Sequence, residues 1–259
     1  MLLAIDIGNT NVVFGFFIKG KLVQTKRISS TISRTEDELW IVLKEFLAQV
    51  KTSPESMEGV VISSVVSELN EIFINTVKEN FKITPLFINS MMDLGFKIPY
   101  DDPTTLGADR ICNVFAVIKK FGGPAIIVDF GTATTYDIIT NKCEYLGGVI
   151  APGLKMSAIG LFQQTSKLPK VELKFPETIV GKNTVRAIQS GVMYGAIDAF
   201  EGMVKRLRRV VGKYAIVVAT GGYASIIAEM TNEIKYLEPN LVLEGERLIY
   251  EHVKKKSKR

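Results

Sequence analysis

Residues 2–18 read LLAIDIGNTNVVFGFFI, and residues 124–139 read PAIIVDFGTATTYDII. In each stretch an apolar run ends in an Asp-x-Gly triplet, and a second apolar run follows it. Short apolar runs bounded by glycine and polar residues are typical of strands joined by tight turns. Because Asp6-x-Gly8 and Asp129-x-Gly131 both stand at the end of an apolar strand, the sequence predicts one structural unit that occurs twice.

The segments that follow the two triplets also resemble each other. In the first half we expect strands and helices in the order strand (2–7), strand (12–18), strand (21–28), helix, strand (59–66), helix and a weaker strand (85–88). A capping box of Ser33 and Glu36 predicts the start of the first helix. In the second half we expect strands at 124–130, 133–139, 143–150 and 214–219, a long helix at 183–210, and helices at 224–231 and 240–253.

This repetition predicts an α/β fold of two similarly built halves with a cleft between them. We place the halves at residues 1–118 and 119–259, although no low-complexity linker marks the join. The stretch from Asn89 to Leu106 is expected to be a loop, and a loop of this length in a compact domain is often functional. A helix is expected from Gly107 to about Phe121.

The charge of the chain is concentrated at its end. The sequence has 32 Lys+Arg against 27 Asp+Glu, which gives a net charge of +5, but residues 254–259 read KKKSKR and carry all of that excess. A nucleic-acid-binding domain needs basic residues on one face of its fold, so the neutral body disfavours nucleic acid as a partner. We expect the basic tail 254–259 to be a solvated terminus.

Histidine and cysteine are scarce. The chain has one histidine, His252, and two cysteines, Cys112 and Cys143. Three such residues cannot supply the four ligands of a usual structural zinc site, and two cysteines do not make a disulfide framework. No apolar run approaches the ~18 residues of a membrane span, and the N-terminus lacks the basic region of a signal peptide. The composition therefore predicts a cytoplasmic protein that acts through carboxylates, hydroxyls and basic groups, with no membrane partner.

The Asp-x-Gly turns are the candidate phosphate sites. The chain contains no G-x-G triplet, which excludes the dinucleotide-binding fingerprint. In Asp6–Asn11, a glycine would let the backbone approach a phosphate, and the Asn and Thr side chains could donate to its oxygens. A carboxylate beside a phosphate is reasonable when Mg²⁺ lies between them. One such turn is more often a plain hairpin turn, but two at equivalent places favour phosphate binding.

Asp109 and Arg110 form the third feature, and two interpretations stay open. Asp109 would lie in the first turn of a helix, where it could compensate the helix dipole or pair with Arg110. Alternatively, Asp109 takes a proton from a substrate hydroxyl while Arg110 binds an anionic substrate group. From spacing alone the structural interpretation is favoured. The glycine-rich turns 147–153 and 220–222 could approach a ligand or be only turns.

Together these stretches resemble the type III pantothenate kinases, a branch of the actin-like sugar-kinase superfamily. The resemblance runs in order over residues 2–245 and is carried by DIGNTNVVFG (6–15), GADR (107–110), DFGTATT (129–135), GGVIAPG (147–153) and GKNTVRAIQSG (181–191). It implies two ribonuclease-H-like halves, each a mixed sheet with flanking helices, with the active site in the cleft. It also implies phosphorylation of pantothenate by ATP, the first step of coenzyme A synthesis.

The resemblance assigns roles to individual residues. ATP would be bound by Asp6, Ile7, Gly8, Asn9, Thr10, Asn11, Val12 and Val13 of the first turn and by Thr132 of the second. Asp129 would bind a monovalent cation, K⁺ or NH₄⁺, and Asp6 would hold Mg²⁺ through water. Asp109 would accept the proton of the pantothenate hydroxyl, and the pantothenate pocket would be lined by Tyr100, Gly107, Ala108, Asp109, Arg110 and Thr184. The resemblance also implies a homodimer.

Two other functions remain open at this stage. The chain could be an actin-like kinase for another small hydroxy compound, or a nucleotide-binding regulator without kinase turnover. The presence of both Asp109 and Arg110 disfavours the regulator.

Overall fold

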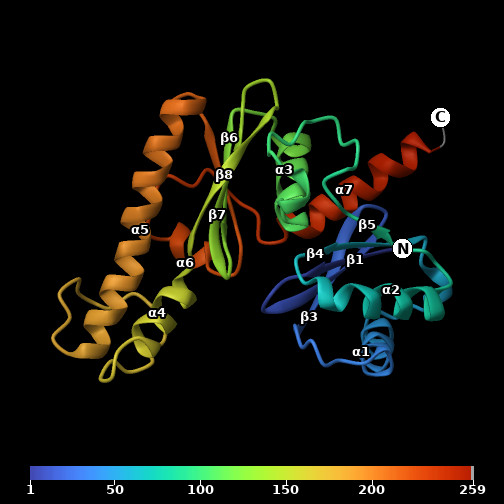
Figure 1. Ribbon diagram of the computed structural model, residues 1–259, viewed down its shortest axis with the longest axis horizontal. Helices are drawn as coiled ribbons and strands as arrows, with labels where there is room; N and C mark the ends of the chain where they lie inside the picture. The colour runs from blue at the N-terminus through green and yellow to red at the C-terminus, as the bar shows by residue number, and fades with distance from the viewer. Residues whose placement is uncertain (258–259) are drawn as a thin grey trace. The chain divides into compact units, whose positions relative to one another are not determined.

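The computed structural model of the chain describes residues 1–257 and is shown in Figure 1. It divides into two compact units. The first unit comprises residues 1–116 and the C-terminal segment that begins at Leu241, and the second comprises Val117–Asn240. Each unit is built around one mixed five-stranded sheet.

The first sheet has the strand order β3-β2-β1-β4-β5. Its strands are β1 (Leu2–Ile7), β2 (Asn11–Ile18), β3 (Lys21–Ser29), β4 (Gly59–Ser64) and β5 (Leu86–Phe87). β1 lies at the centre of this sheet. It pairs antiparallel with β2 and parallel with β4. The helices of this unit are α1 (Glu36–Gln49), α2 (Ser67–Phe81), α3 (Ala108–Lys120), whose last four residues belong to the second unit, and α7 (Leu241–Lys256).

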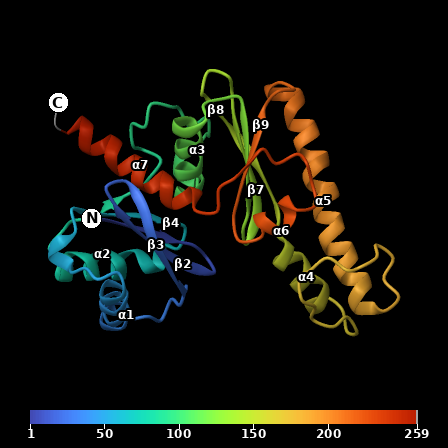
Figure 2. The same ribbon diagram turned by 180° about the vertical axis from the view of Figure 1, so that it is seen from behind.

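Both faces of the first sheet are covered by helices. Successive strand residues point to opposite faces, so Leu3, Ile5 and Ile7 of β1 share one face and pack in the core with α1 and α2. The alternate residues, among them Asp6 on β1 and Ser63 on β4, therefore point to the other face. α7 packs along β1 and β4, and Figures 1 and 2 show it on the side of the strands away from α1 and α2. Asp6 thus lies on the face that α7 covers.

The second sheet repeats this order as β8-β7-β6-β9-β10, with β6 at its centre. Its strands are β6 (Ala125–Phe130), β7 (Ala133–Ile139), β8 (Tyr145–Pro152), β9 (Ile216–Thr220) and β10 (Tyr236–Leu237). Its helices are α4 (Leu154–Gln163), α5 (Thr184–Val211) and α6 (Ala224–Ala228). Ile126, Val128 and Phe130 of β6 pack in a core with the buried face of α5, the long helix of Figure 1. The predicted α/β fold with two similar mixed sheets is confirmed.

The expected boundary of the halves differs from the structure at the C-terminus. We expected residues 119–259 to form the second half, but α7 returns to the first sheet. Two glycines allow the close approach: a Cβ on Gly59 would lie 2.0 Å from the hydroxyl oxygen of Tyr250, and one on Gly245 would lie 2.2 Å from the carbonyl oxygen of Cys112. Tyr250 also donates a hydrogen bond to the carbonyl of Glu58 at 2.8 Å.

Several element boundaries differ as well. The capping box that starts α1 is formed by Thr35 and Glu38, so the expected pair Ser33 and Glu36 is wrong. A start at Glu36 places three acidic residues in the first turn, where they complement the helix dipole. Helix α4 and strand β10 were not expected, and the basic segment 254–256 is the last turn of α7. Residues 258–259 of the predicted tail lie outside the described residues.

No helix among residues 1–257 is both long enough and apolar enough to span a membrane.

Candidate active site

The first Asp-x-Gly turn connects β1 to β2. The Gly8 N–H donates to the carbonyl oxygen of Asn11 at 3.0 Å and closes the turn. Ser30, which follows β3, fixes the turn from the side: its hydroxyl donates to the Gly8 carbonyl, and its N–H donates to the Thr10 carbonyl at 3.1 Å. Asn9 and Thr10 are exposed at the tip, whereas Ile7 and Val12 on the flanking strands are buried. The turn is therefore anchored by its base and presents polar groups at its tip.

Asp6 lies half-buried, one residue before the end of β1. It is opposite Val13 on β2 and opposite Ser63 on β4. The Ser63 hydroxyl donates to Asp6 Oδ1 at 3.2 Å, so one carboxylate oxygen is held from the neighbouring strand. Sequence reasoning missed Ser63.

Asp109 lies in the first turn of α3, beside Gly107 and Ala108. The Arg110 N–H donates to Asp109 Oδ1 at 2.8 Å. Burial of the side chain raises the pKa of Asp109 above its ordinary value, although this hydrogen bond and the charge of Arg110 oppose the shift. Gly107 leaves room for the carboxylate, because a Cβ there would lie 2.5 Å from Asp109 Oδ1. A desolvated carboxyl of this kind is a stronger base than an exposed one.

Arg110 is buried next to Asp109, and only 6% of it is exposed. Its Nη1 donates to the hydroxyl of Tyr100 at 3.1 Å. Tyr100 belongs to the expected loop 89–106, in which the only helical turn is the short segment Pro103–Thr105. The structure thus brings Tyr100 next to residues 107–110 through its contact with Arg110.

Asp6 and Asp109 also share a neighbour. Cys112 lies one turn after Asp109 on α3 and is fully buried. Burial raises the pKa of the Cys112 thiol well above its ordinary value, and the carboxyls of Glu246, Asp6 and Asp109 add to this shift. The charges of Asp6 and Asp109 thus both act on this buried thiol.

The second Asp-x-Gly turn connects β6 to β7 and is held by backbone packing. A Cβ on Gly153 would lie 2.3 Å from the Thr132 carbonyl oxygen. Gly221 has a φ of +93°, and a Cβ there would lie 2.4 Å from Asp129 Oδ1. Thr132 is exposed at the tip, and Asp129 is half-buried at the base. Residues 147–152, which the sequence predicts as a glycine-rich turn, belong to strand β8 instead, so that prediction is wrong. Gly153, directly after this strand, and Gly221, directly after β9, pack against residues 129–132.

The predicted metal residues fit weakly coordinated ions. Among residues 1–257 no three or more His, Cys, Asp or Glu side chains gather in a cluster that could hold a metal. Mg²⁺ in phosphate sites usually keeps several waters and needs only one or two carboxylates, so Asp6 fits such an ion. Gly131 and Gly221 pack close to Asp129 Oδ1, because a Cβ at either would lie 3.2 or 2.4 Å from that oxygen.

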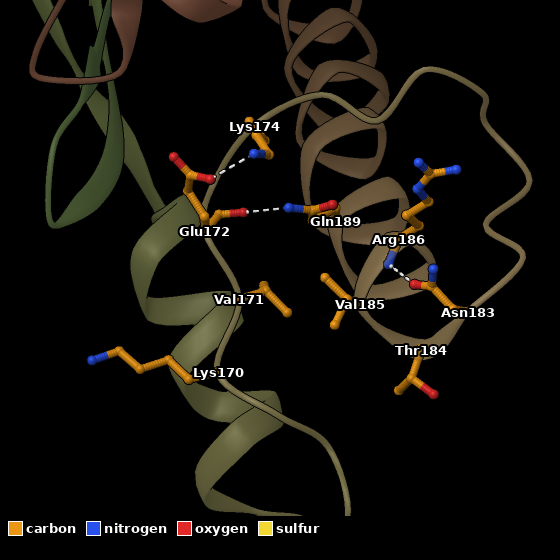
Figure 3. A pocket seen from close by; sticks show the side chains of 9 residues that line it. All are labelled: Lys170, Val171, Glu172, Lys174, Asn183, Thr184, Val185, Arg186 and Gln189. Carbon is orange, nitrogen blue, oxygen red and sulfur yellow. Dashed lines mark hydrogen bonds and ion pairs between the residues drawn. The ribbon is translucent and has the colours of Figure 1, made fainter.

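Thr184 lies in the second unit and lines a pocket of about 670 Å³ (Figure 3). The pocket lies between residues 170–174 and the first turns of α5. Thr184 does not cap this helix, because Asn183 accepts a hydrogen bond from the Arg186 N–H at 2.9 Å. The pocket also contains Lys170, Lys174 and Arg186 with one acidic residue, Glu172, which pairs with Lys174 at 2.7 Å.

A further acidic residue of the first unit escaped the sequence analysis. Glu246 on α7 is fully buried, and its Oε1 accepts a hydrogen bond from the Ser63 N–H at 3.0 Å. The sequence carried a signal, because Leu243, Glu246 and Ile249 follow one another at a spacing of three. A charged residue in an apolar stripe of a helix indicates a buried carboxyl.

The sequence comparisons match this chain to a family of kinases. The profile of the family described as type III pantothenate kinase matches residues 2–206. The type III pantothenate kinase of Moorella thermoacetica is 44% identical over 251 residues, which cover 97% of this chain and 99% of that protein. That of Bacillus cytotoxicus is 42% identical and covers 97% and 96% of the two chains.

Solved structures share the fold at low identity. A putative Baf family transcriptional activator from Campylobacter jejuni has a TM-score of 0.60 at 22% identity and covers 98% of this chain and 99% of that chain. MreB 5 of Spiroplasma citri, bound to AMPPNP, has a TM-score of 0.54 at 12% identity and covers 99% and 98% of the two chains. These likenesses support the actin-like ATPase fold.

Proposed function

We propose, from the premise that this chain belongs to the type III pantothenate kinase family, that Asp109 is the group that accepts the proton of the pantothenate hydroxyl. The chain is a kinase that uses ATP to phosphorylate pantothenate in coenzyme A biosynthesis. The observation that carries the role of Asp109 is its burial, which raises the pKa of the carboxyl and makes it a better base at neutral pH. The alternatives of another acceptor and of a regulator without turnover find no support in the family assignment.

The reaction is an attack of the pantothenate hydroxyl oxygen on the γ-phosphorus of ATP. The bond from this phosphorus to the bridging oxygen of ADP breaks as the new P–O bond forms, and Asp109 takes the hydroxyl proton. Because phosphoryl transfer has little covalent chemistry for the protein to do, positioning and charge stabilisation supply most of the rate. The hydrogen bond from the Arg110 N–H fixes one oxygen of Asp109, which orients the carboxylate for this task.

We assign ATP to the two Asp-x-Gly turns. The exposed tip of the first turn offers Asn9 and Thr10, and the second offers Thr132, as donors to phosphate oxygens. Asp6 would hold Mg²⁺ through water, and Asp129 would hold K⁺ or NH₄⁺. When bound, these cations neutralise charge on the phosphates.

We assign pantothenate, which is an anion, to Arg110 and Tyr100 of the first unit, and Thr184 remains a pantothenate residue through the family resemblance alone. The buried guanidinium of Arg110 is oriented by Tyr100 and offers directed N–H donors to an anionic group. Thr184 contributes a hydroxyl at the start of α5, in a pocket that carries an excess of basic side chains.

We also propose that the protein forms a homodimer and is located in the cytoplasm. Several apolar side chains on α4 and around the start of α5 are exposed, and a subunit interface is one way in which a protein covers such side chains. The residues are Met156, Leu161, Phe162, Ile179, Val180 and Val185. The two cysteines are free, which agrees with a reducing compartment.

The test of the proposed base is pantothenate-dependent ADP release by wild type and by Asp109→Asn. We expect kcat to fall about 10²- to 10⁴-fold, the usual contribution of a positioned acid–base group. Asp101→Asn is the matched control, because Asp101 is an exposed aspartate in the neighbouring loop. Equal kcat values for Asp109→Asn and wild type would exclude the role.

A further inference from the structure

Glu246 occupies an unusual environment for an acidic side chain. It is 0% exposed, and its Oε1 accepts the Ser63 N–H, while its Oε2 has no hydrogen-bond partner among the described residues. Burial and the neighbouring charge of Asp6 raise the pKa of Glu246 well above its ordinary value. Because burying a polar group without full hydrogen bonding costs free energy, an apolar side chain would serve simple packing better.

Ser63 connects Glu246 to Asp6. Its N–H donates to Glu246 Oε1 at 3.0 Å, and its hydroxyl donates to Asp6 Oδ1 at 3.2 Å. Ser63 lies opposite Asp6 in the β1–β4 pairing, on the sheet face that α7 covers. A change at Glu246 therefore reaches Asp6 through a single residue.

The position of Glu246 is fixed by the packing of α7. A Cβ on the adjacent Gly245 would lie 2.2 Å from the Cys112 carbonyl oxygen, so the α7 backbone is in close contact with α3 at this point. Leu243 and Ile249, on the same side of α7, are buried. The packing of α7 thus fixes the carboxyl of Glu246 next to Ser63. Supporting residues of functional sites usually lie on such packed helices and strands.

We propose that Glu246 is a positioning residue for phosphoryl transfer, which holds Ser63 and through it directs the carboxylate of Asp6 toward the nucleotide. The positioning role rests on the proposed role of Asp6. Partners of this kind, which orient a ligand-binding carboxylate, typically change affinity or activity 10- to 100-fold when they are removed.

The test uses two substitutions, each of which removes one hydrogen bond of the path that leads from Glu246 through Ser63 to Asp6. Glu246→Met removes the acceptor but keeps a side chain of similar length, and Ser63→Ala removes only the hydroxyl. We expect each to raise the Kd of a non-hydrolysable ATP analogue with Mg²⁺, measured by calorimetry, about tenfold. We expect the KM for pantothenate to stay within about twofold, because the path leads to Asp6 and not to the acceptor.

Two variants serve as controls. Glu246→Gln keeps the oxygen that accepts the Ser63 N–H, so it should bind the analogue within about twofold of wild type. Glu251→Gln removes a carboxylate of the same helix that pairs with Arg247 away from Ser63, and it should also bind as wild type does. A loss confined to Glu246→Met and Ser63→Ala would identify the acceptor and the hydroxyl as the parts that matter.

The double variant distinguishes positioning from packing. If Glu246 acts through Ser63, the Kd of Glu246→Met with Ser63→Ala equals that of either single variant within about twofold, because both changes break one path. The proposal would be overturned if the increase in Kd of the double variant were the product of the increases in the two single variants. It would also be overturned if Glu246→Met had a wild-type Kd and only a lower Tm. If Glu246→Met does not fold, Ser63→Ala decides, and a wild-type Kd in it would overturn the proposal.

Asp6→Asn, measured in parallel, separates this inference from the proposed function. Wild-type analogue binding in Asp6→Asn would contradict the role of Asp6 itself. Weakened binding in Asp6→Asn, together with wild-type binding in Glu246→Met and Ser63→Ala, would overturn only the positioning role.

Discussion

The two sheets of this kinase have the same strand order and place an aspartate at the same position. In β1 and in β6 every residue is buried except the aspartate, which is half-buried one residue before the strand ends. Asp6 lies opposite Ser63 on the parallel neighbour, and Asp129 lies opposite Thr220 on its own. In both sheets, therefore, the central strand places its aspartate at the same position relative to the parallel neighbouring strand.

The surroundings of the two aspartates differ. Ser30, Ser63 and Glu246 hold the first turn and Asp6 through hydrogen bonds. Gly153 and Gly221 hold the second turn through direct backbone packing. The first turn also spans residues 8–11 between its paired strand ends, whereas the second spans only 131–133.

This difference indicates that the two turns are held in place in two different ways. Side-chain hydrogen bonds can orient a single carboxylate oxygen, which suits Asp6 if it faces a hydrated magnesium ion. Glycine packing instead holds the backbone of the second turn close to neighbouring backbone, and a side chain at Gly153 or Gly221 would collide with it. Substitutions in the second turn should therefore affect folding first, and those around the first should affect nucleotide binding first.

The largest expected effect is a loss of folding stability at Gly221, which follows Thr220, compared with Ser64, which follows Ser63. Gly221→Ala places a Cβ 2.4 Å from Asp129 Oδ1 at a φ of +93°, so strain and overpacking together should cost about 3 kcal/mol of unfolding free energy. Ser64→Ala, at the equivalent place in the first unit, loses the hydrogen bonds between its hydroxyl and Val66 and should cost about 1 kcal/mol. Denaturant unfolding measures both, and equal losses would contradict the contrast.

The next prediction separates the aspartates by chemistry. Asp6→Asn should lower kcat/KM for ATP about a hundredfold and should raise the Mg²⁺ concentration needed for activity, because a charge that faces the phosphates is lost. Asp129→Asn should instead remove the difference between K⁺ and Na⁺ buffers. Steady-state rates with the two salts test this, and a K⁺ dependence that survives in Asp129→Asn would break the assignment.

The smallest effect is expected at the end of α7. Lys256 pairs with Asp93 at 2.6 Å, and Asp93 is exposed. Exposed ion pairs contribute little, so Lys256→Ala should change kcat by less than about twofold. A larger loss would mean that this contact positions the loop that carries Tyr100, and the basic segment would then take part in the first unit's chemistry.

The sequence was sufficient for the repeated sheets, because strand periodicity and the Asp-x-Gly triplets are local patterns. It was also sufficient to group Tyr100 with residues 107–110, through the resemblance to the family. The return of α7 was not predictable from local signals, since it depends on the contacts of Gly245 and Gly59 with distant residues. Ser63 and Glu246 escaped for the same reason: their partner Asp6 is close only in the folded chain.

The most direct test of the proposed base is the pH dependence of kcat at saturating ATP and pantothenate. The carboxylate is the active form of Asp109, and burial raises its pKa, so activity should be lost on acidification at a pH above the ordinary range of aspartate. We predict that wild type shows this acid limb and that Asp109→Asn shows a low rate without it. The same limb in both proteins, at similar rates, would contradict the role of Asp109.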